Sequence, residues 1–154
     1  MDMDTLIGTA LGAVIGVTTT LIAERARWNR EHSSREKATK REVYGAYLGA
    51  MSLTLHHLRA LRREEGLTRE VRISRVGQTI AAEGAYNLRY QVVITAPDQL
   101  GELAEHAFAC LRAVRDRFDT ADVGTDPGWD PAFNAADEAL KELRVAMRSD
   151  LERG

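Results

Sequence analysis

The chain has 154 residues, of which 44% are hydrophobic and 29% charged. This composition is typical of one compact domain and excludes a multidomain enzyme or a chain that is disordered throughout. The net charge of −2 does not mark a nucleic-acid binder, and a single cysteine excludes an intramolecular disulfide.

An uncharged stretch of nineteen residues runs from Thr5 to Ala23 near the start of the chain. A helix of that length spans roughly 28 Å, close to the ~30 Å hydrocarbon core of a bilayer. We therefore expect residues 5–23 to form a transmembrane helix, preceded by residues 1–4 as a short extracytoplasmic N-terminus. The alternative is a buried core helix of a protein that does not enter the membrane.

The charge step across this stretch predicts its orientation. Acidic residues precede it, whereas residues 24–41 carry seven cations against three glutamates. The positive-inside rule then predicts a single-pass protein of the cytoplasmic (inner) membrane, with its N-terminus outside and the rest of the chain in the cytoplasm. The side chains expected at the membrane interface, beside anionic lipid head groups, are Arg25, Arg27, Trp28 and Arg30.

Small residues recur every fourth position within the expected anchor. Residues four apart lie on one helix face, and small side chains there let a second backbone approach closely. We therefore expect a homo-oligomer that associates through Gly8, Gly12, Gly16 and Thr20, with a monomeric anchor as the alternative.

Residues 24–34 are a basic juxtamembrane neck with little to bury, and Ser33–Glu36 resembles a capping box at which a helix restarts. From about Arg35 to Glu65, apolar residues recur at spacings of four and three, which predicts an amphipathic helix. Gly66 is the expected stop, and Thr68 the expected start of the next helix.

The second helix is expected from about Arg69 to Ile94, although Gly77 and Gly84 lower its propensity. Its end could also form a strand, but no partner strand is evident. Thr95 is the expected cap of the third helix, which reaches about Asp119. A loop of about ten residues precedes the last helix, which opens at Asp130–Pro131.

These elements predict an all-α protein, with an N-terminal transmembrane helix followed by a cytoplasmic antiparallel four-helix bundle over residues 35–154. No second domain, internal repeat or low-complexity tract is evident.

The sequence carries no phosphate loop, nucleophile elbow or zinc spacing. Its four histidines do not supply the Glu-x-x-His pairs of a di-iron bundle. We therefore expect no catalytic residue, cofactor or metal. The carboxylates of the last loop do not match a calcium loop, and they favour turns for backbone reasons: Asp119, Asp122, Asp126 and Asp130.

A cluster of arginines around the first turn between helices could meet an acidic partner, although a solvated face is the default. Trp129 either plugs the end of the bundle or offers a docking handle. The candidate docking residues are Arg59, Arg62, Arg63 and Trp129.

The neck Arg25–Arg30, the Lys-Arg-Glu-x-Tyr-x-x-Tyr-Leu start at Lys40–Leu48 and the turn at Ala96–Asp98 resemble, over the whole chain, a group of uncharacterised small single-pass membrane-anchored helical proteins of bacteria. The resemblance implies the architecture and carries over no catalytic residue.

The expected function is that of a non-enzymatic, membrane-tethered interaction or scaffold module. Its expected partners are further copies of itself and a membrane or cytoplasmic protein, without nucleic acid. The alternatives are a membrane-perturbing, holin-like pore former and a metal-dependent bundle enzyme.

Overall fold

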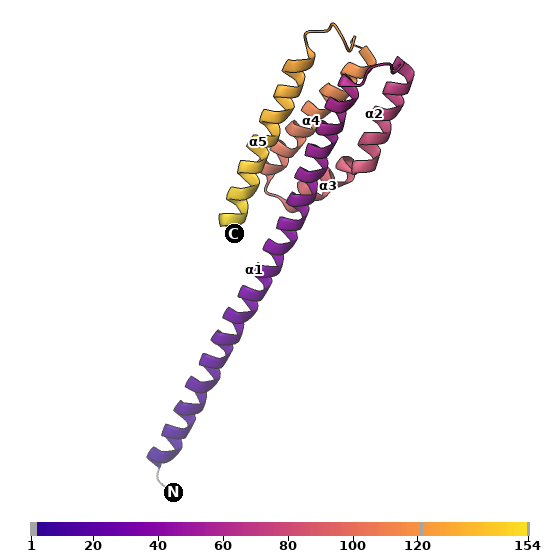
Figure 1. The fold of residues 1–154 in the computed structure, drawn as a ribbon. Coiled ribbons are helices and arrows are strands. Elements are labelled where there is room, and N and C mark those ends of the chain that lie inside the picture. The colour runs from indigo at the N-terminus through magenta and orange to yellow at the C-terminus, as the bar shows by residue number, and fades with distance from the viewer. Residues whose placement is uncertain (1–2, 121, 154) are drawn as a thin grey trace. The chain divides into compact units, whose positions relative to one another are not determined.

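The computed structural model describes the backbone of residues 3–120 and 122–153, and the side chains of Trp28 and of residues 34–120 and 122–153. The helices are α1 (Met3–Arg63), α2 (Arg69–Glu83), α3 (Ala85–Thr95), α4 (Asp98–Thr120) and α5 (Trp129–Arg153) (Figure 1). The described residues contain no strand, so the predicted all-α class is confirmed. The chain divides into two units, Met1–Ala38 and Thr39–Gly154, and the second holds the end of α1 together with α2–α5.

The expected helix restart at Ser33–Glu36 is wrong. Residues 33–36 lie inside α1, without a break in the helical backbone. The physical reason is composition, because residues 24–41 contain neither glycine nor proline and are rich in arginine, lysine, glutamate and alanine. A capping-box pattern stops a helix only where the neighbouring residues disfavour it.

Among the residues whose side chains are described, no helix combines the length and the apolar character needed to cross a membrane. The side chains of residues 5–23 lie outside that part of the chain. The transmembrane helix therefore stays a prediction.

The second unit is an antiparallel helical bundle, because residue numbers rise along α1 as they fall along α5. Tyr44 of α1 contacts Asp150, Arg59 contacts Asp137, and Arg62 contacts Asp130. Helices α4 and α5 pack side by side as a hairpin (Figure 1). The predicted bundle is confirmed in its helical packing, but two short helices, α2 and α3, occupy the place of the second long one.

The predicted single helix over Arg69–Ile94 is broken at Gly84. This glycine has φ 66° and ψ 16°, the left-handed conformation that a side chain disfavours. It ends α2, and its carbonyl accepts hydrogen bonds from the N–H groups of Asn87 and Leu88 at the start of α3. The break is a change of direction within a helical segment, and the alternative of a strand before Thr95 is wrong.

The turn between α1 and α2 is the one that the sequence predicts. Gly66 has φ 76°, and the Thr68 hydroxyl caps α2 by accepting from the N–H of Val71 at 3.4 Å. The expected cap of the next long helix is wrong, because Thr95 ends α3 and its hydroxyl donates to the Gln91 carbonyl. The Pro97 carbonyl instead accepts hydrogen bonds from the N–H groups of Leu100 and Gly101 in the first turn of α4.

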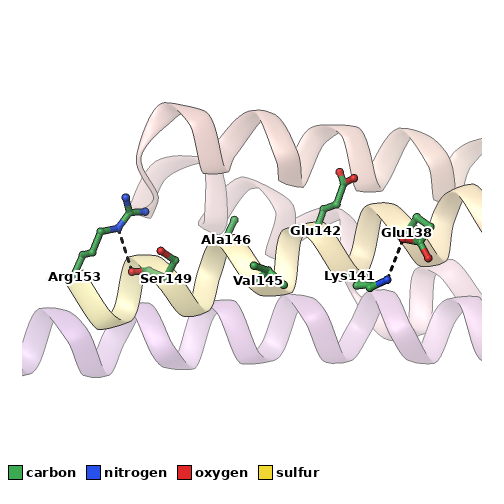
Figure 2. A pocket seen from close by; sticks show the side chains of 7 residues that line it. All are labelled: Glu138, Lys141, Glu142, Val145, Ala146, Ser149 and Arg153. Carbon is green, nitrogen blue, oxygen red and sulfur yellow. Dashed lines mark hydrogen bonds and ion pairs between the residues drawn. The ribbon is translucent and has the colours of Figure 1, made fainter.

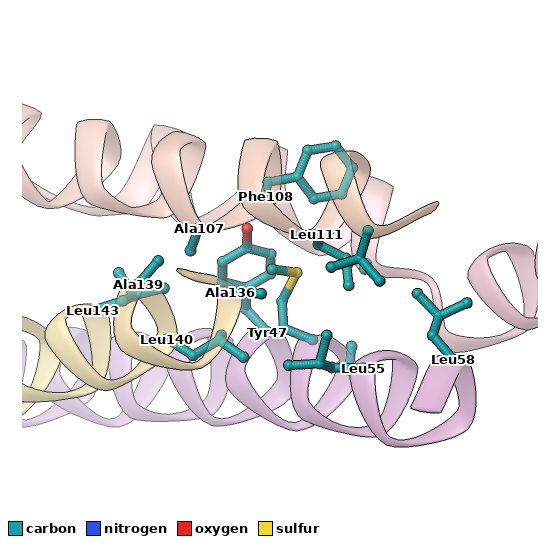
Figure 3. Packing of buried hydrophobic residues seen from close by; sticks show 14 of the residues in the cluster. Tyr47, Leu55, Leu58, Ala107, Phe108, Leu111, Ala136, Ala139, Leu140 and Leu143 are labelled. Atoms are coloured by element: carbon teal, nitrogen blue, oxygen red, sulfur yellow. The ribbon is translucent and has the colours of Figure 1, made fainter. Parts of the chain in front are cut away.

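The core of the second unit lies between α1, α4 and α5 (Figure 3). Leu55 of α1 lies across from Leu111 of α4, whereas Leu58 of α1 and Leu143 of α5 lie toward opposite ends of the core, and all four are fully buried. Burial of each such side chain stabilises the fold by about 1.5–3 kcal/mol relative to exposure. The predicted apolar stripes thus point inward.

Two buried tyrosines connect α1 to its neighbours through their hydroxyl groups. Tyr44 donates to the Asp150 carboxylate at 2.9 Å, and Tyr47 donates to the Ala104 carbonyl at 3.0 Å. Burial raises the pKa of both phenols, with a further contribution at Tyr44 from Asp150. Each hydroxyl bonds to one residue at a defined position along the neighbouring helix. The two hydrogen bonds together therefore set the register of α1 against α5 and α4.

Candidate functional site

The three arginines singled out by the sequence lie together where α1 ends and α5 begins. They line a pocket of about 330 Å³. We call this site the arginine pocket; its lining residues are Arg59, Arg62, Arg63, Asp130, Phe133 and Asn134. Three further arginines near the same turn do not line it: Arg69, Arg72 and Arg75.

Two of the guanidinium groups are held in place from two sides. Arg59 forms an ion pair with Asp137 and lies over the Phe133 ring, 5.0 Å from its centroid. Arg62 donates to Asp130 at 2.6 Å and lies 5.5 Å from the Trp129 centroid. A carboxylate on one side and an aromatic face on the other restrict each side chain.

Arg63 differs from its two neighbours. It is exposed and forms no ion pair within the part of the chain that the structure describes. Asn134 lines the same pocket and is also exposed. The pocket therefore presents three guanidinium groups and an amide to solvent, against the single lining carboxylate of Asp130.

This arrangement suits a carboxylate or phosphate group. Guanidinium groups bind such oxyanions through paired N–H donors, and an amide adds a further donor. The neighbouring aspartates keep two of the arginines partly neutralised, so the Arg63 charge is the one most available to a ligand. The lining carboxylate, Asp130, pairs with Arg62, and the donors of the pocket are suited to binding such a group.

Trp129 is not a docking handle. Its side chain is fully buried, its ring contacts Phe118 at 4.7 Å between centroids, and its Nε1–H donates to the Asp122 carbonyl at 3.0 Å. The interpretation of Trp129 as a plug of the bundle end fits the structure, because the ring closes the core beneath the arginine pocket. It contacts the pocket through Arg62 and through Phe133, whose ring stacks on it with centroids 6.2 Å apart.

Carboxylates of the loop before α5 accept hydrogen bonds from backbone N–H groups of the same loop. Asp122 accepts from the N–H groups of Gly124 at 2.7 Å and Thr125 at 3.1 Å, and these bonds lower the pKa of its carboxyl group. Asp126 accepts from Gly128 and pairs with Arg117. Each of these loop carboxylates thus has donors of its own.

The histidines and the cysteine lie apart from the arginine pocket. His57 pairs with Glu83 at 3.4 Å. His106 lies 3.8 Å from the Cys110 sulfur, and burial raises the pKa of the Cys110 thiol. Among the described residues, no group of three or more potential ligands could hold a metal ion.

The predicted anchor residues fall outside the described side chains. This holds for Gly8, Gly12, Gly16 and Thr20, and for Arg25, Arg27 and Arg30. Trp28 is described, and its side chain is 73% exposed. The predictions of self-association and of membrane contact at these positions are therefore untested.

A second, larger depression lies on the outer face of α5. It measures about 520 Å³ and is lined by α5 residues alone, among them Glu138, Lys141 and Arg153 (Figure 2). Lys141 pairs with Glu138, and the Arg153 guanidinium donates to the Ser149 carbonyl. Because no second element contributes to its lining, it is the weaker candidate.

Sequence reasoning missed two arginines with structural roles. Arg72 is buried, and its guanidinium donates to the carbonyls of Leu61 and Glu64 at the end of α1. Arg89 packs between Tyr90 and Phe108 and pairs with Glu105. Neither role has a sequence signal, because each depends on which helix lies beside the arginine.

Comparison with known proteins finds no matching family model, no similar curated protein and no similar solved structure. The resemblance to small membrane-anchored bacterial proteins thus rests on the motifs of the sequence alone.

Proposed function

We propose that this protein is a non-enzymatic, membrane-tethered interaction module whose helical bundle binds an acidic group of a partner protein in the arginine pocket. The observation that carries the proposal is the convergence of Arg59, Arg62 and Arg63 on one pocket, with two of the three guanidinium groups fixed by ion pairs and aromatic rings. Preorganised donors bind an oxyanion at a smaller entropic cost than mobile ones.

The proposed tether is the uncharged stretch over residues 5–23, followed at once by cations. Sodium carbonate washing of membranes from cells expressing the full chain tests it. We expect the protein to stay in the pellet and to be released by detergent. Recovery of the full chain in the carbonate supernatant would contradict the tether and leave the bundle itself untouched.

The proposed oligomer rests on the row of small residues at Gly8, Gly12 and Gly16. Replacing Gly12 by Ile adds a branched side chain in the middle of the row, which would hold two backbones apart. Cross-linking of the full chain in membranes should then give less dimer than the parent. Leu11→Ile, which places the same branched side chain on another face of the helix, serves as the control.

The docking role of the arginine pocket is tested by charge reversal. Arg63→Glu removes the most available cation, and Arg144→Glu makes the same change at an exposed position of α5 that forms no ion pair within the described residues. Tagged full chains are purified from native membranes, and the proteins that accompany them are compared. We expect a partner that is present with the parent and with Arg144→Glu but lost with Arg63→Glu.

Identical sets of accompanying proteins for the two variants would contradict docking at this pocket. A partner lost with both variants would point to the overall charge of the bundle instead. In either case the carbonate result stands by itself, so the tether and the docking site can fail separately.

A further inference from the structure

Helix α3 carries apolar residues on two sides, and one of these sides is open to solvent. Its inner side buries Ala85 and Val92. On the outer side the exposed fractions are 38% for Tyr86, 57% for Tyr90, 41% for Val93 and 84% for Ile94. We call these four residues the α3 face. A contiguous exposed patch of this kind on a small domain marks an interaction surface.

The aromatic residues of the α3 face are held rigidly from below. Tyr86 packs edge-on against Phe108 at 4.8 Å, and its hydroxyl accepts a hydrogen bond from Arg115 at 3.0 Å. The Arg89 guanidinium lies 4.5 Å from the Tyr90 centroid and pairs with Glu105. Rings fixed in this way lose little conformational entropy when a partner covers them.

Charged residues of α4 border this face in a definite order. Helix α4 lies antiparallel beside α3, since Gly101 approaches Val93 and Glu105 pairs with Arg89. Asp98 and Glu102 therefore lie near the Ile94 end, whereas Arg112 lies beyond Phe108, near the Tyr86 end. All three are exposed and form no ion pair within the described part of the chain.

We propose that the α3 face binds the same face of a second copy of this chain, with the two α3 helices antiparallel about a two-fold axis at Tyr90. Ile94 of one copy then packs on Tyr86 of the other. Asp98 and Arg112 lie at similar distances on either side of the Tyr90 level, so each carboxylate meets the partner's guanidinium. A face with acids at one end and a base at the other is complementary to itself in this orientation.

The same order of charges argues against other occupants. A parallel pair would place Asp98 and Glu102 against their own copies, which like charges disfavour. An anionic membrane surface would also meet these carboxylates beside Ile94. The pairing uses no residue of the arginine pocket, which lies where α1 meets α5.

The size of the α3 face indicates a weak pair. The exposed parts of its four side chains amount to on the order of 500 Å² per copy, below the ~800 Å² per partner of a standard interface. We therefore expect the amount of dimer to depend on the local concentration of the protein. For this reason the test uses the full chain inside the cells that express it.

The experiment uses a bis-maleimide cross-linker and a chain in which Cys110 is replaced by Ala. Asn87→Cys places a thiol on the exposed border of α3 and leaves all four residues of the α3 face intact. Val145→Cys, at a position on α5 that is 65% exposed, is the matched control. We expect dimer with Asn87→Cys at several times the yield of Val145→Cys, and a return to the control yield when Ile94→Asp is added. Equal yields would overturn the proposal.

A charge swap identifies the occupant. In the Asn87→Cys chain, Asp98→Arg should lower the dimer yield several-fold, because it faces Arg112 of the second copy. Adding Arg112→Asp restores the opposite order and should recover most of the yield. Only pairing between two copies predicts this rescue, so its failure would overturn the antiparallel pair. Circular dichroism of each variant confirms that the bundle is folded.

Discussion

Aromatic residues meet arginines in two places of the bundle, with opposite results. At the start of α5, Arg59 and Arg62 lie outside Phe133 and Trp129, and both rings are buried. On α3, Arg89 packs behind Tyr90, between that ring and Phe108, and Tyr90 is left 57% exposed. An arginine on the solvent side of a ring covers that ring. An arginine on the core side supports the ring and leaves its other face exposed.

The difference follows from the helices that carry the rings. Helix α5 has one apolar stripe, and Phe133, Ala136 and Leu140 on that stripe face the core. Helix α3 follows the turn at Gly84 and carries apolar residues on two sides, and its neighbours bury only one of these sides. A stabilising aromatic cluster and a surface for a partner can thus have the same residue types.

The largest expected effect is on the buried ring. Trp129→Ala removes the plug of the bundle end and should lower the free energy of unfolding by about 3–5 kcal/mol. Ile94→Ala on the α3 face should change it by no more than about 0.5 kcal/mol. Urea unfolding of the full chain, followed by far-ultraviolet circular dichroism, measures both. A similar loss for the two variants would show that α3 is part of the stabilising core.

A smaller effect is expected where an arginine covers a ring. Arg62→Ala removes the contact with Trp129 and a partly exposed ion pair with Asp130, and should cost about 1 kcal/mol of unfolding free energy. Arg63→Ala, the control at the next position, should leave stability within about 0.5 kcal/mol of the parent. The same urea titration applies. A cost for Arg63→Ala as large as that for Arg62→Ala would contradict the distinction between a covering arginine and one available for binding.

The smallest expected effect concerns the loop that leads to Trp129. Bonds from Gly124 and Thr125 lower the pKa of Asp122 in the folded state, so its charge stabilises the fold above the unfolded pKa of about 3.9. This contribution is lost as the pH falls through the lower, folded pKa. Asp122→Asn should therefore lower the Tm slightly at pH 7, and the difference from the parent should shrink towards pH 3. A Tm difference that stays constant with pH would show that the effect of Asp122→Asn comes from the shape of the side chain and not from its charge.

The sequence by itself determined the helical class, the inward apolar stripe of residues 35–65 and the turn at Gly66, because periodicity, capping and left-handed glycines are properties of neighbouring residues. It also selected the arginines of the pocket, though without their partners. It misjudged the capping box at Ser33–Glu36 and the continuity of residues 69–94, since a local signal can be overridden by helix propensity or by one glycine.

Tertiary structure alone decided which side of each ring is covered. Trp129 could be a plug or a handle until Phe118 and Arg62 were placed around it. The α3 face acquires its meaning from the charges of α4, which lie beside it only after the chain has turned at Pro97. Burial and charge complementarity are relations between segments distant in sequence, so no local pattern can contain them.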